Sequence, residues 1–309
     1  MKEMLLKQKK KGEILFLEYG KVSACLILLV GIVVMGARIY ILVRAQTLTV
    51  SFLDVGQGDA ILIQTPSGHT MLVDGGPSDR VLEKVSEKMS YFNHHIDAVV
   101  ATHPDVDHIT GLIPILQKYE VDHIITSPVG GHTGVFDTLQ KSIEEEGDGV
   151  TSDHHAQVHV GQEGDEIQFG DGVVAYILYP SPTTHIRLKD TNDASVSIVV
   201  TYGQESVLLT GDLPSTHEGE LISKGLPRNI TIYKAGHHGS KYSSGDQLLS
   251  YVRPEYAVIS AGKDNKYGHP NMETMERLKT YAKEVITTIE RGTVSFELDG
   301  TSVTMKSDR

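Results

Sequence analysis

Short apolar runs alternate with polar turns along the chain from about position 46 to its end. Apolar runs of about four to eight residues, bounded by Gly, Asp or His, are typical of buried strands. Between groups of these runs lie stretches with apolar residues three and four positions apart, which is the spacing of amphipathic helices. Grouped strands with helices between them predict an α/β layered domain with mixed sheets.

The pattern places the elements as follows. Strands are expected at Leu48–Leu53, Ala60–Gln64, Thr70–Val73, Ala98–Ala101, His123–Thr126, Val173–Tyr179, Ser195–Tyr202, Val207–Thr210, Ile230–Tyr233, Tyr256–Ser260, Val285–Thr288 and Val294–Leu298. Helices are expected at Arg80–Phe92, Thr110–Tyr119, Val135–Glu146, Ser215–Lys224, Ser244–Tyr251 and Met272–Lys283. We expect no second domain boundary after Gln46.

The head of the chain has a different pattern, because Val22–Val43 is almost wholly apolar. Its 22 residues would make a helix of about 33 Å, enough to cross a hydrocarbon core of about 30 Å. We therefore expect a basic cytoplasmic segment (1–21), a transmembrane anchor (22–43) and a folded domain (46–309). A cleaved signal peptide is the alternative, but its apolar region is shorter, about 7–15 residues. The Lys residues at or before position 21 place the N-terminus in the cytoplasm and the domain outside the cell.

Charge and composition restrict the classes further. Residues 1–45 hold eight of the 28 Lys/Arg and three of the 40 Asp/Glu, which leaves a net charge of −17 on the remainder. Such an acidic body argues against broad non-specific affinity for nucleic acid, although bound cations can make a local phosphate site. One Cys excludes an internal disulfide, and 39% hydrophobic residues exclude wholesale disorder.

Polar residues follow several predicted strands at the point where each strand ends. Asp74, the segment 102–108, Gly211-Asp212, the segment 237–240 and Gly268-His269 all occupy such positions or come soon after one. In open α/β sheets, binding sites gather beyond the carboxyl ends of the strands. We expect these side chains to converge.

The densest group is His103, Asp105, Asp107 and His108, within six residues. Imidazole and carboxylate together suit divalent metals. One tight turn cannot aim four ligands at one ion, so two adjacent ions that share Asp212 as a bridging carboxylate are the more natural chemistry.

These residues resemble a known family. H-x-D-x-D-H followed by Gly111 is similar to the H-x-H-x-D-H signature of the metallo-β-lactamase superfamily, with Asp105 in place of the second His. With F-L-D-V-G-Q-G-D-A (52–60), D-G-G (74–76), T-G-D (210–212), H-H-G-S (237–240) and Y-G-H-P (267–270), the chain resembles the C-terminal hydrolase domain of the ComEC competence protein family. The resemblance implies a four-layer αβ/βα sandwich and a two-metal hydrolase. That family carries the domain on a multi-helix membrane channel, whereas we expect one membrane helix here. Its transport role therefore does not carry over.

The resemblance also implies roles. His103 and Asp105 would hold the first ion, Asp107 and His108 the second, with Asp212 between them. His238 is the expected last ligand of the second ion and His269 its rival; whichever is not a ligand would donate a proton or contact the oxyanion. Catalytic roles are expected for His269, His237 and Asp107. The residues expected around substrate or behind the ligands are Asp74, Ser240, Asn192, Ser195, Lys234 and Asp59.

The first ion lacks the third His that most of the superfamily provides. Candidates by position are His123, His132, His154, His155, His159 and His185, none in a convincing motif. The resemblance points instead to Asn192 and Ser195, which are weak ligands. Lys234 is expected either as a strand-end residue or as a phosphate contact, and Asp59 either as a turn former or near the metals.

The expected function is a membrane-anchored extracellular hydrolase that needs two divalent ions, Mn²⁺ or Zn²⁺, and acts on nucleic acid or another phosphodiester polymer. The alternatives are a phosphodiesterase of a cell-wall or choline-phosphate polymer, a lactam or lactone hydrolase, and a non-catalytic tethered binding module. Asp in place of the second His argues against a β-lactamase. Carboxylates favour hard ions, so we expect more activity with Mn²⁺ than with Zn²⁺. The membrane is the expected partner through the N-terminal helix, and no protein partner is expected.

Overall fold

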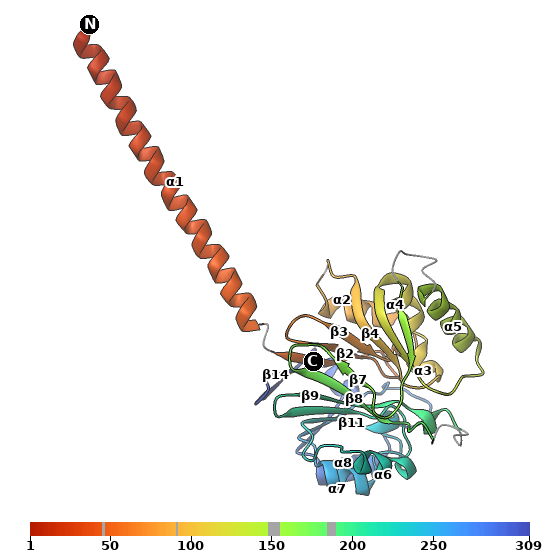
Figure 1. Ribbon diagram of the computed structural model, residues 1–309. Coiled ribbons are helices and arrows are strands. Elements are labelled where there is room, and N and C mark those ends of the chain that lie inside the picture. The colour runs from red at the N-terminus through yellow and green to blue at the C-terminus, as the bar shows by residue number, and fades with distance from the viewer. Residues whose placement is uncertain (45–46, 91, 148–154, 184–189) are drawn as a thin grey trace. The chain divides into compact units, whose positions relative to one another are not determined.

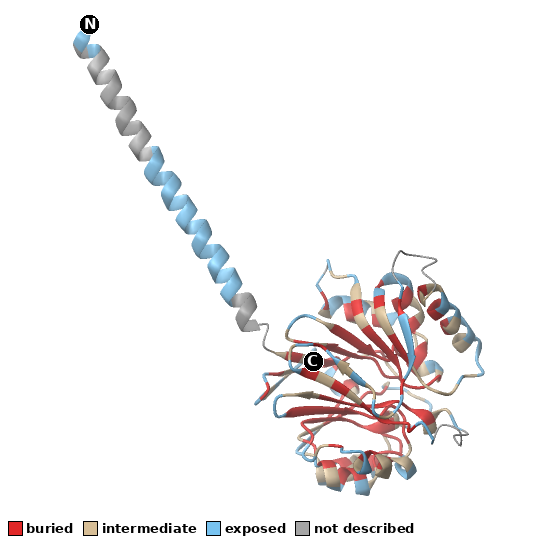
Figure 2. Cartoon of the chain, viewed as in Figure 1, coloured by how far each residue is buried: buried red, intermediate tan, exposed pale blue. Residues whose placement is uncertain are grey.

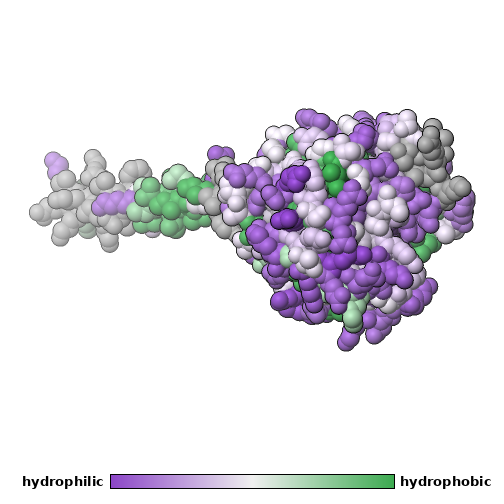
Figure 3. Space-filling view, turned by 90° about the horizontal axis from the view of Figure 1, so that it is seen from below, coloured by the Kyte–Doolittle hydropathy of each residue, from purple (hydrophilic) through white to green (hydrophobic). Residues whose placement is uncertain are grey.

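The structure is a computed structural model that describes residues 1–44, 47–90, 92–147, 155–183 and 190–309. It divides into two compact units, Met1–Gln46 and Thr47–Arg309. The first unit is a single helix, α1 (Lys2–Arg44). Within it, Tyr19–Ile39 is long and apolar enough to cross a membrane by length and composition. In Figure 3 the apolar side chains gather along this stretch, whereas the visible face of the second unit is mainly hydrophilic.

The second unit contains two sheets. The first has the strand order β15-β14-β1-β2-β3-β4-β5-β6 and the second β13-β12-β11-β10-β9-β8-β7. The strands of the first are β1 (Leu48–Phe52), β2 (Ile61–Gln64), β3 (Thr70–Val73), β4 (His95–Ala101), β5 (Glu120–Thr126), β6 (Gln157–Val160), β14 (Val294–Leu298) and β15 (Val303–Ser307). Those of the second are β7 (Glu166–Gln168), β8 (Val173–Tyr179), β9 (Ser197–Tyr202), β10 (Glu205–Leu209), β11 (Ile232–Lys234), β12 (Tyr256–Ile259) and β13 (Glu284–Thr287).

Helices cover the outer face of each sheet (Figure 1). On the first sheet these are α2 (Arg80–Lys88), α3 (Val106–Ile109), α4 (Leu112–Lys118) and α5 (Gly134–Gly147); on the second they are α6 (Ser215–Ser223), α7 (Asp246–Val252) and α8 (Met272–Tyr281), with the short α9 (Thr288–Arg291) following β13. This order of helix, sheet, sheet and helix confirms the predicted four-layer αβ/βα sandwich.

Three apolar clusters hold the layers together. One lies between the sheets and includes Val50, Ile198 and Phe296. The second lies under α2, α4 and α5, and the third under α6, α7 and α8. Successive residues of one strand serve two layers: Val207 faces the inter-sheet cluster and Leu208 the outer one. Strands buried on both faces read as continuous apolar runs, and Figure 2 shows their burial.

The hydrophobic pattern misses three strands. All four residues of β6 are exposed, β7 has three residues, and β15 alternates between exposed and half-buried positions. Each of these strands lies at a sheet edge. Edge strands gain backbone hydrogen bonds without burying a run of apolar side chains, so they leave no continuous apolar signal in the sequence.

Candidate metal centre

The predicted site residues meet beyond the carboxyl ends of strands from both sheets. Asp74 follows β3, His103 follows β4, Asp212 follows β10 and His238 follows β11. Strands β3 and β4 are parallel, as are β10, β11 and β12. Their carboxyl ends therefore face the same way within each sheet, and the loops that follow them come together.

Two glycines let these loops approach closely. A Cβ on Gly58 would lie 2.2 Å from the carbonyl oxygen of Asp107, and Gly58 has a φ of +150°. A Cβ on Gly111 would lie 2.0 Å from the carbonyl oxygen of Gly75. Gly58 of the G-Q-G segment and Gly111 are thus required by the close packing around the metal centre, and no phosphate cradle is needed to explain them.

Asp212 lies at the middle of a group of side chains. Its Oδ1 is 3.3 Å from His108 Nε2, and its Oδ2 is 3.8 Å from His103 Nε2 and 3.7 Å from His238 Nε2. Two further carboxylates complete the group: Asp107 Oδ2 lies 3.4 Å from His238 Nε2 and Asp105 Oδ2 lies 3.9 Å from His103 Nε2. We call these six residues, His103, Asp105, Asp107, His108, Asp212 and His238, the central cluster.

The donor atoms of this cluster fit divalent metal ions. His103, His108, Asp212 and His238 are all buried. Their atoms His103 Nε2, His108 Nε2, Asp212 Oδ1 and His238 Nε2 are buried and have no hydrogen-bond partner among the described residues. Buried polar atoms are almost always satisfied, so four unsatisfied ones aimed at one place need an explanation. Imidazole nitrogens and carboxylate oxygens are ligands of Zn²⁺ and Mn²⁺.

Asp74 supports the side of the central cluster that contains His108. Its carboxylate accepts hydrogen bonds from the Thr102 backbone N–H (2.9 Å) and hydroxyl (2.7 Å). Its Oδ2 also lies 2.8 Å from His108 Nδ1. A carboxylate that binds the far nitrogen of an imidazole fixes the tautomer and leaves the other nitrogen free to coordinate a metal. Asp74 therefore aims His108 Nε2 at Asp212.

Asp59 and Lys234 support the side of the central cluster that contains His238. Asp59 Oδ1 lies 3.2 Å from His238 Nδ1, and its Oδ2 lies 2.9 Å from the ammonium of Lys234. Both side chains are 1% exposed. Of the two roles considered for Lys234, this geometry favours the strand-end residue over the phosphate contact, because its ammonium is buried and bound to Asp59 and the carbonyl oxygen of Ala235. Asp59 is also no simple turn former, since it reaches His238.

The charges of the cluster shift its pKa values in opposite directions. Burial acts to lower the pKa of His238, but the carboxylates of Asp212 and Asp59 outweigh it and raise that pKa to about 9. Burial also acts to lower the pKa of His108, but the carboxylates of Asp212 and Asp74 outweigh it and raise that pKa. Burial, helped by His108, lowers the pKa of His103 to about 4. Without ions, these shifts favour the protonated forms of His108 and His238, so a metal that binds their Nε2 atoms would displace protons.

His237 lies beside the central cluster, and the His269 ring packs against the His237 ring. The backbone of His237 and His238 has φ values of +48° and +54°, and the turn is closed by the Ser240 N–H, which donates to the His237 carbonyl oxygen (2.8 Å). This turn places His237 Nε2 3.5 Å from Asp212 Oδ2. The His269 ring packs edge-on against the His237 ring at 5.4 Å. This geometry favours His238 over His269 as the last ligand.

The segment before β9 borders the first-ion side. Thr191 Oγ1 donates to Asp105 Oδ1 (2.6 Å), and the Ser195 hydroxyl accepts from the Asp212 backbone N–H (3.2 Å). Ser195 thus supports the Asp212 backbone. The side-chain oxygen of Asn192 is buried and has no hydrogen-bond partner among the described residues.

The His residues considered as a third ligand lie elsewhere or outside the described residues. His154 and His185 fall outside them. His132 is exposed, and His155 Nδ1 lies 3.2 Å from the carbonyl oxygen of Gly147. His123 Nδ1 lies 3.3 Å from His159 Nε2 in a separate pocket.

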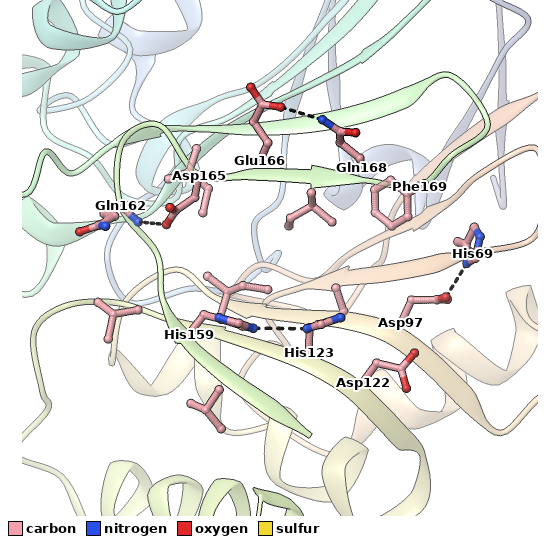
Figure 4. Close-up of a pocket in the computed structure, with 16 residues that line it drawn as sticks. His69, Asp97, Asp122, His123, His159, Gln162, Asp165, Glu166, Gln168 and Phe169 are labelled. Carbon is pink, nitrogen blue, oxygen red and sulfur yellow. Dashed lines mark hydrogen bonds and ion pairs between the residues drawn. The ribbon is translucent and has the colours of Figure 1, made fainter. Parts of the chain in front are cut away.

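That pocket, of about 760 Å³, lies between the two sheets near β6 and β7 (Figure 4). His and Asp gather there too: Asp97 accepts from the Thr70 backbone N–H (2.7 Å) and contacts His69, and Asp122 lies 3.0 Å from His95. We call this group, His69, His95, Asp97, Asp122, His123 and His159, the edge cluster.

Comparison with known proteins places the chain in a family. A model of the metallo-beta-lactamase superfamily matches residues 53–263. The chain is 28% identical over 266 residues to "ComE operon protein 3" of Bacillus subtilis and 32% identical over 252 residues to "Recombination protein 2" of Haemophilus influenzae. Each match covers 80% of this chain but only 32% and 28% of those proteins. The chain thus spans about a third of the length of these curated relatives.

One solved structure supports the fold. A long form of RNase Z from yeast is 10% identical, with a TM-score of 0.50, over 81% of this chain and 42% of that one. The sandwich, the buried His/Asp cluster and the matched family model lead to one conclusion: the chain belongs to the metallo-β-lactamase superfamily and resembles the hydrolase domain of the ComEC competence family.

Proposed function

We propose that the chain is a two-metal phosphodiesterase that cleaves nucleic acid. The observation that carries this proposal is the set of buried, unsatisfied nitrogen and oxygen atoms around Asp212. The name of one relative, "Recombination protein 2", supports the substrate, because recombination acts on DNA.

The central cluster divides into two halves. His103 and Asp105 would hold one ion, and Asp107, His108 and His238 the other, with Asp212 shared. Two such ions activate a water molecule and stabilise the charge on the attacked phosphate. No thiolate is present, and the set has as many carboxylates as imidazoles. This balance supports Mn²⁺ as the working ion, even though Zn²⁺ binds most such sites more tightly.

The remaining residues orient the metal ligands or transfer protons. Asp74 orients His108 through its Nδ1 atom. Asp59 and the Ser260 carbonyl oxygen, which lies 3.1 Å from His238 Nδ1, orient His238. His269 is the candidate for proton transfer to the leaving oxygen, because its buried Nδ1 has no hydrogen-bond partner among the described residues. His237, 29% exposed and beside Asp212, is placed to contact a bound phosphate.

The test is an activity panel on the full-length protein in detergent, stripped of metal and reloaded with Mn²⁺ or Zn²⁺. The substrates are single- and double-stranded DNA, RNA, bis-(p-nitrophenyl) phosphate, a choline-phosphate ester and a β-lactam. We expect cleavage of the nucleic acids and of the nitrophenyl diester. Exclusive turnover of the choline ester or the β-lactam would refute the proposal, as would no turnover with any metal.

Two variants separate ligand from proton donor. His238→Ala should lose bound metal together with activity. His269→Ala should keep its metal and lose turnover. The opposite result would exchange the two roles.

We also propose that α1 anchors the domain to a membrane, with 1–21 cytoplasmic, 22–43 in the membrane and the hydrolytic domain 46–309 outside. The support is the apolar stretch Tyr19–Ile39 and the Lys residues that precede Val22. Protease added to intact cells should digest the domain. Digestion only after lysis would show the inverted orientation.

A further inference from the structure

A line of aromatic rings leads from the central cluster to the surface. His237 lies beside Asp212, and the His269 ring packs against the His237 ring. Tyr267 then stacks on His269, with ring centroids 5.9 Å apart and planes 25° apart. Tyr267 is 54% exposed. The outer end of this line is thus an accessible aromatic ring in contact with the candidate proton-transfer residue.

The loop that carries Tyr267 is held in place from within. Asn265 Oδ1 accepts from the backbone N–H groups of Tyr267 (3.2 Å) and His269 (3.0 Å). The Gly262 N–H donates to Gln57 Oε1 (3.0 Å), which ties the loop to the glycine-rich segment next to Asp107. Tyr267 is therefore presented from a fixed turn.

Each of two neighbouring loops presents a Tyr with a Lys. The Lys266 ammonium lies 5.1 Å from the Tyr267 ring centroid, and the Lys241 ammonium lies 5.0 Å from that of Tyr242. Tyr242 is 66% exposed and follows the His237–Ser240 turn. Asn271 joins the loops, since its Oδ1 accepts from the Lys241 N–H (2.8 Å).

Aromatic rings beside cationic side chains are what sequence-tolerant proteins use to bind single-stranded nucleic acid: bases stack on the rings and the ammonium groups meet the phosphates. A choline group also binds aromatic rings. Here, however, each ring already has an ammonium about 5 Å from its centre, which repels a second cation. The Tyr–Lys pairs favour a base with its phosphate over a choline polymer.

We propose that Tyr267, with Lys266, stacks an unpaired base of the substrate strand beside the metal centre, and that Tyr242 with Lys241 extends this surface. The proposal rests on the proposed function and narrows its substrate to single-stranded nucleic acid or unpaired ends, because bases inside a duplex are not free to stack on a side chain.

The test compares binding of a DNA strand that has its bases with binding of a strand that lacks them. Full-length protein in detergent is titrated, without metal, with a fluorescent single-stranded DNA oligomer, with the same oligomer made of abasic nucleotides, and with a blunt duplex. Cleavage of each strand is then measured with Mn²⁺. The variants are Tyr267→Ala, Tyr267→Phe and, as a control, Phe92→Ala, an exposed aromatic in the turn before β4.

We expect the parent to bind the normal strand better than the abasic one, and Tyr267→Ala to weaken binding and raise KM for the normal strand by roughly fivefold to a hundredfold. The abasic strand should respond little to the same change. Tyr267→Phe and Phe92→Ala should both behave as the parent, since a phenyl ring is enough for stacking.

Equal effects of Tyr267→Ala on both strands, or equal binding of both strands by the parent, would overturn the proposal. So would displacement of the strand by a phosphocholine oligomer that depends on Tyr267. The binding measurement needs no turnover. A protein that binds bases through Tyr267 but cleaves no phosphodiester would therefore refute the proposed function and still support base stacking on Tyr267.

Discussion

The central cluster and the edge cluster contain the same residue types in opposite states. His69 and His95 of the edge cluster are 44% and 39% exposed, and its carboxylates and imidazoles contact one another: Asp97 with His69, Asp122 with His95, and His123 with His159. In the central cluster, His103 and His108 are fully buried and their Nε2 atoms have no hydrogen-bond partner among the described residues.

The difference shows what makes a metal centre recognisable. His95, Asp97 and Asp122 lie close enough together to be candidates for an ion, as do Asp59, His108, Asp212 and His238. Only the second group combines burial with unsatisfied atoms and with carboxylates that orient the imidazoles from behind. Leaving buried polar atoms unpaired is unfavourable, so the fold keeps such an arrangement for a ligand.

The largest expected effect comes from removing the shared carboxylate. Asp212→Ala should lower hydrolysis by more than about a hundredfold, beyond the 10–100-fold typical of residues behind the ligands. Bound metal should fall below one ion per chain, measured by elemental mass spectrometry. His159→Ala in the edge cluster is the matched control and should leave both unchanged. Equal losses in the two variants would remove the distinction between the clusters.

A smaller effect is expected behind the ligands. Asp59→Asn keeps the shape but removes the charge that faces His238 Nδ1 and Lys234. Metal affinity, measured by competition with a chelator, should fall about 10–100-fold. Asp97→Asn, which changes the corresponding carboxylate of the edge cluster, should not alter it. Unchanged affinity in Asp59→Asn would mean that the Ser260 carbonyl oxygen, 3.1 Å from His238 Nδ1, orients this imidazole without help from Asp59.

Metal affinity should also depend on pH. With the pKa of His238 raised to about 9, the metal-free protein binds a proton there at neutral pH. A metal must displace that proton, so apparent affinity should rise by roughly tenfold per pH unit between pH 6 and 9 for each proton released. Calorimetry in buffers of different ionisation enthalpy counts the protons. Binding without proton release would contradict protonated imidazoles in the metal-free cluster.

The smallest expected effect concerns metal choice. Asp105→His should shift the ratio of Mn²⁺-supported to Zn²⁺-supported activity toward zinc by a fewfold, because imidazole is the softer ligand. A variant that keeps the ratio of the parent would show that Asp105 does not set the metal at the first site.

Much of the fold and of the central cluster could be predicted from the sequence, because the ends of buried strands can be recognised in it. Val173–Tyr179 and Val294–Leu298 have the predicted bounds, and the polar residues that follow β3, β4, β10 and β11 converge as expected. The buried pair Asp59–Lys234 could not be predicted. It joins the glycine-rich loop to a strand far along the chain, and an isolated Asp or Lys carries no signal of burial.

The choice between His238 and His269 was open for a related reason. Both follow strands of the same sheet, so their order in the chain does not separate them. The structure separates them by backbone conformation, since the positive φ values at His237 and His238 turn the His238 ring into the cluster. The helix α3 was likewise hidden, because three of its four residues lie inside the H-x-D-x-D-H segment.

The two-metal centre around Asp212 can be tested by anomalous diffraction at the manganese edge from crystals of the full-length protein grown with Mn²⁺. We expect two peaks about 3.5–4 Å apart, on either side of the Asp212 carboxylate, and none between His123 and His159. Peaks confined to the edge cluster, or no peak beside Asp212, would contradict it.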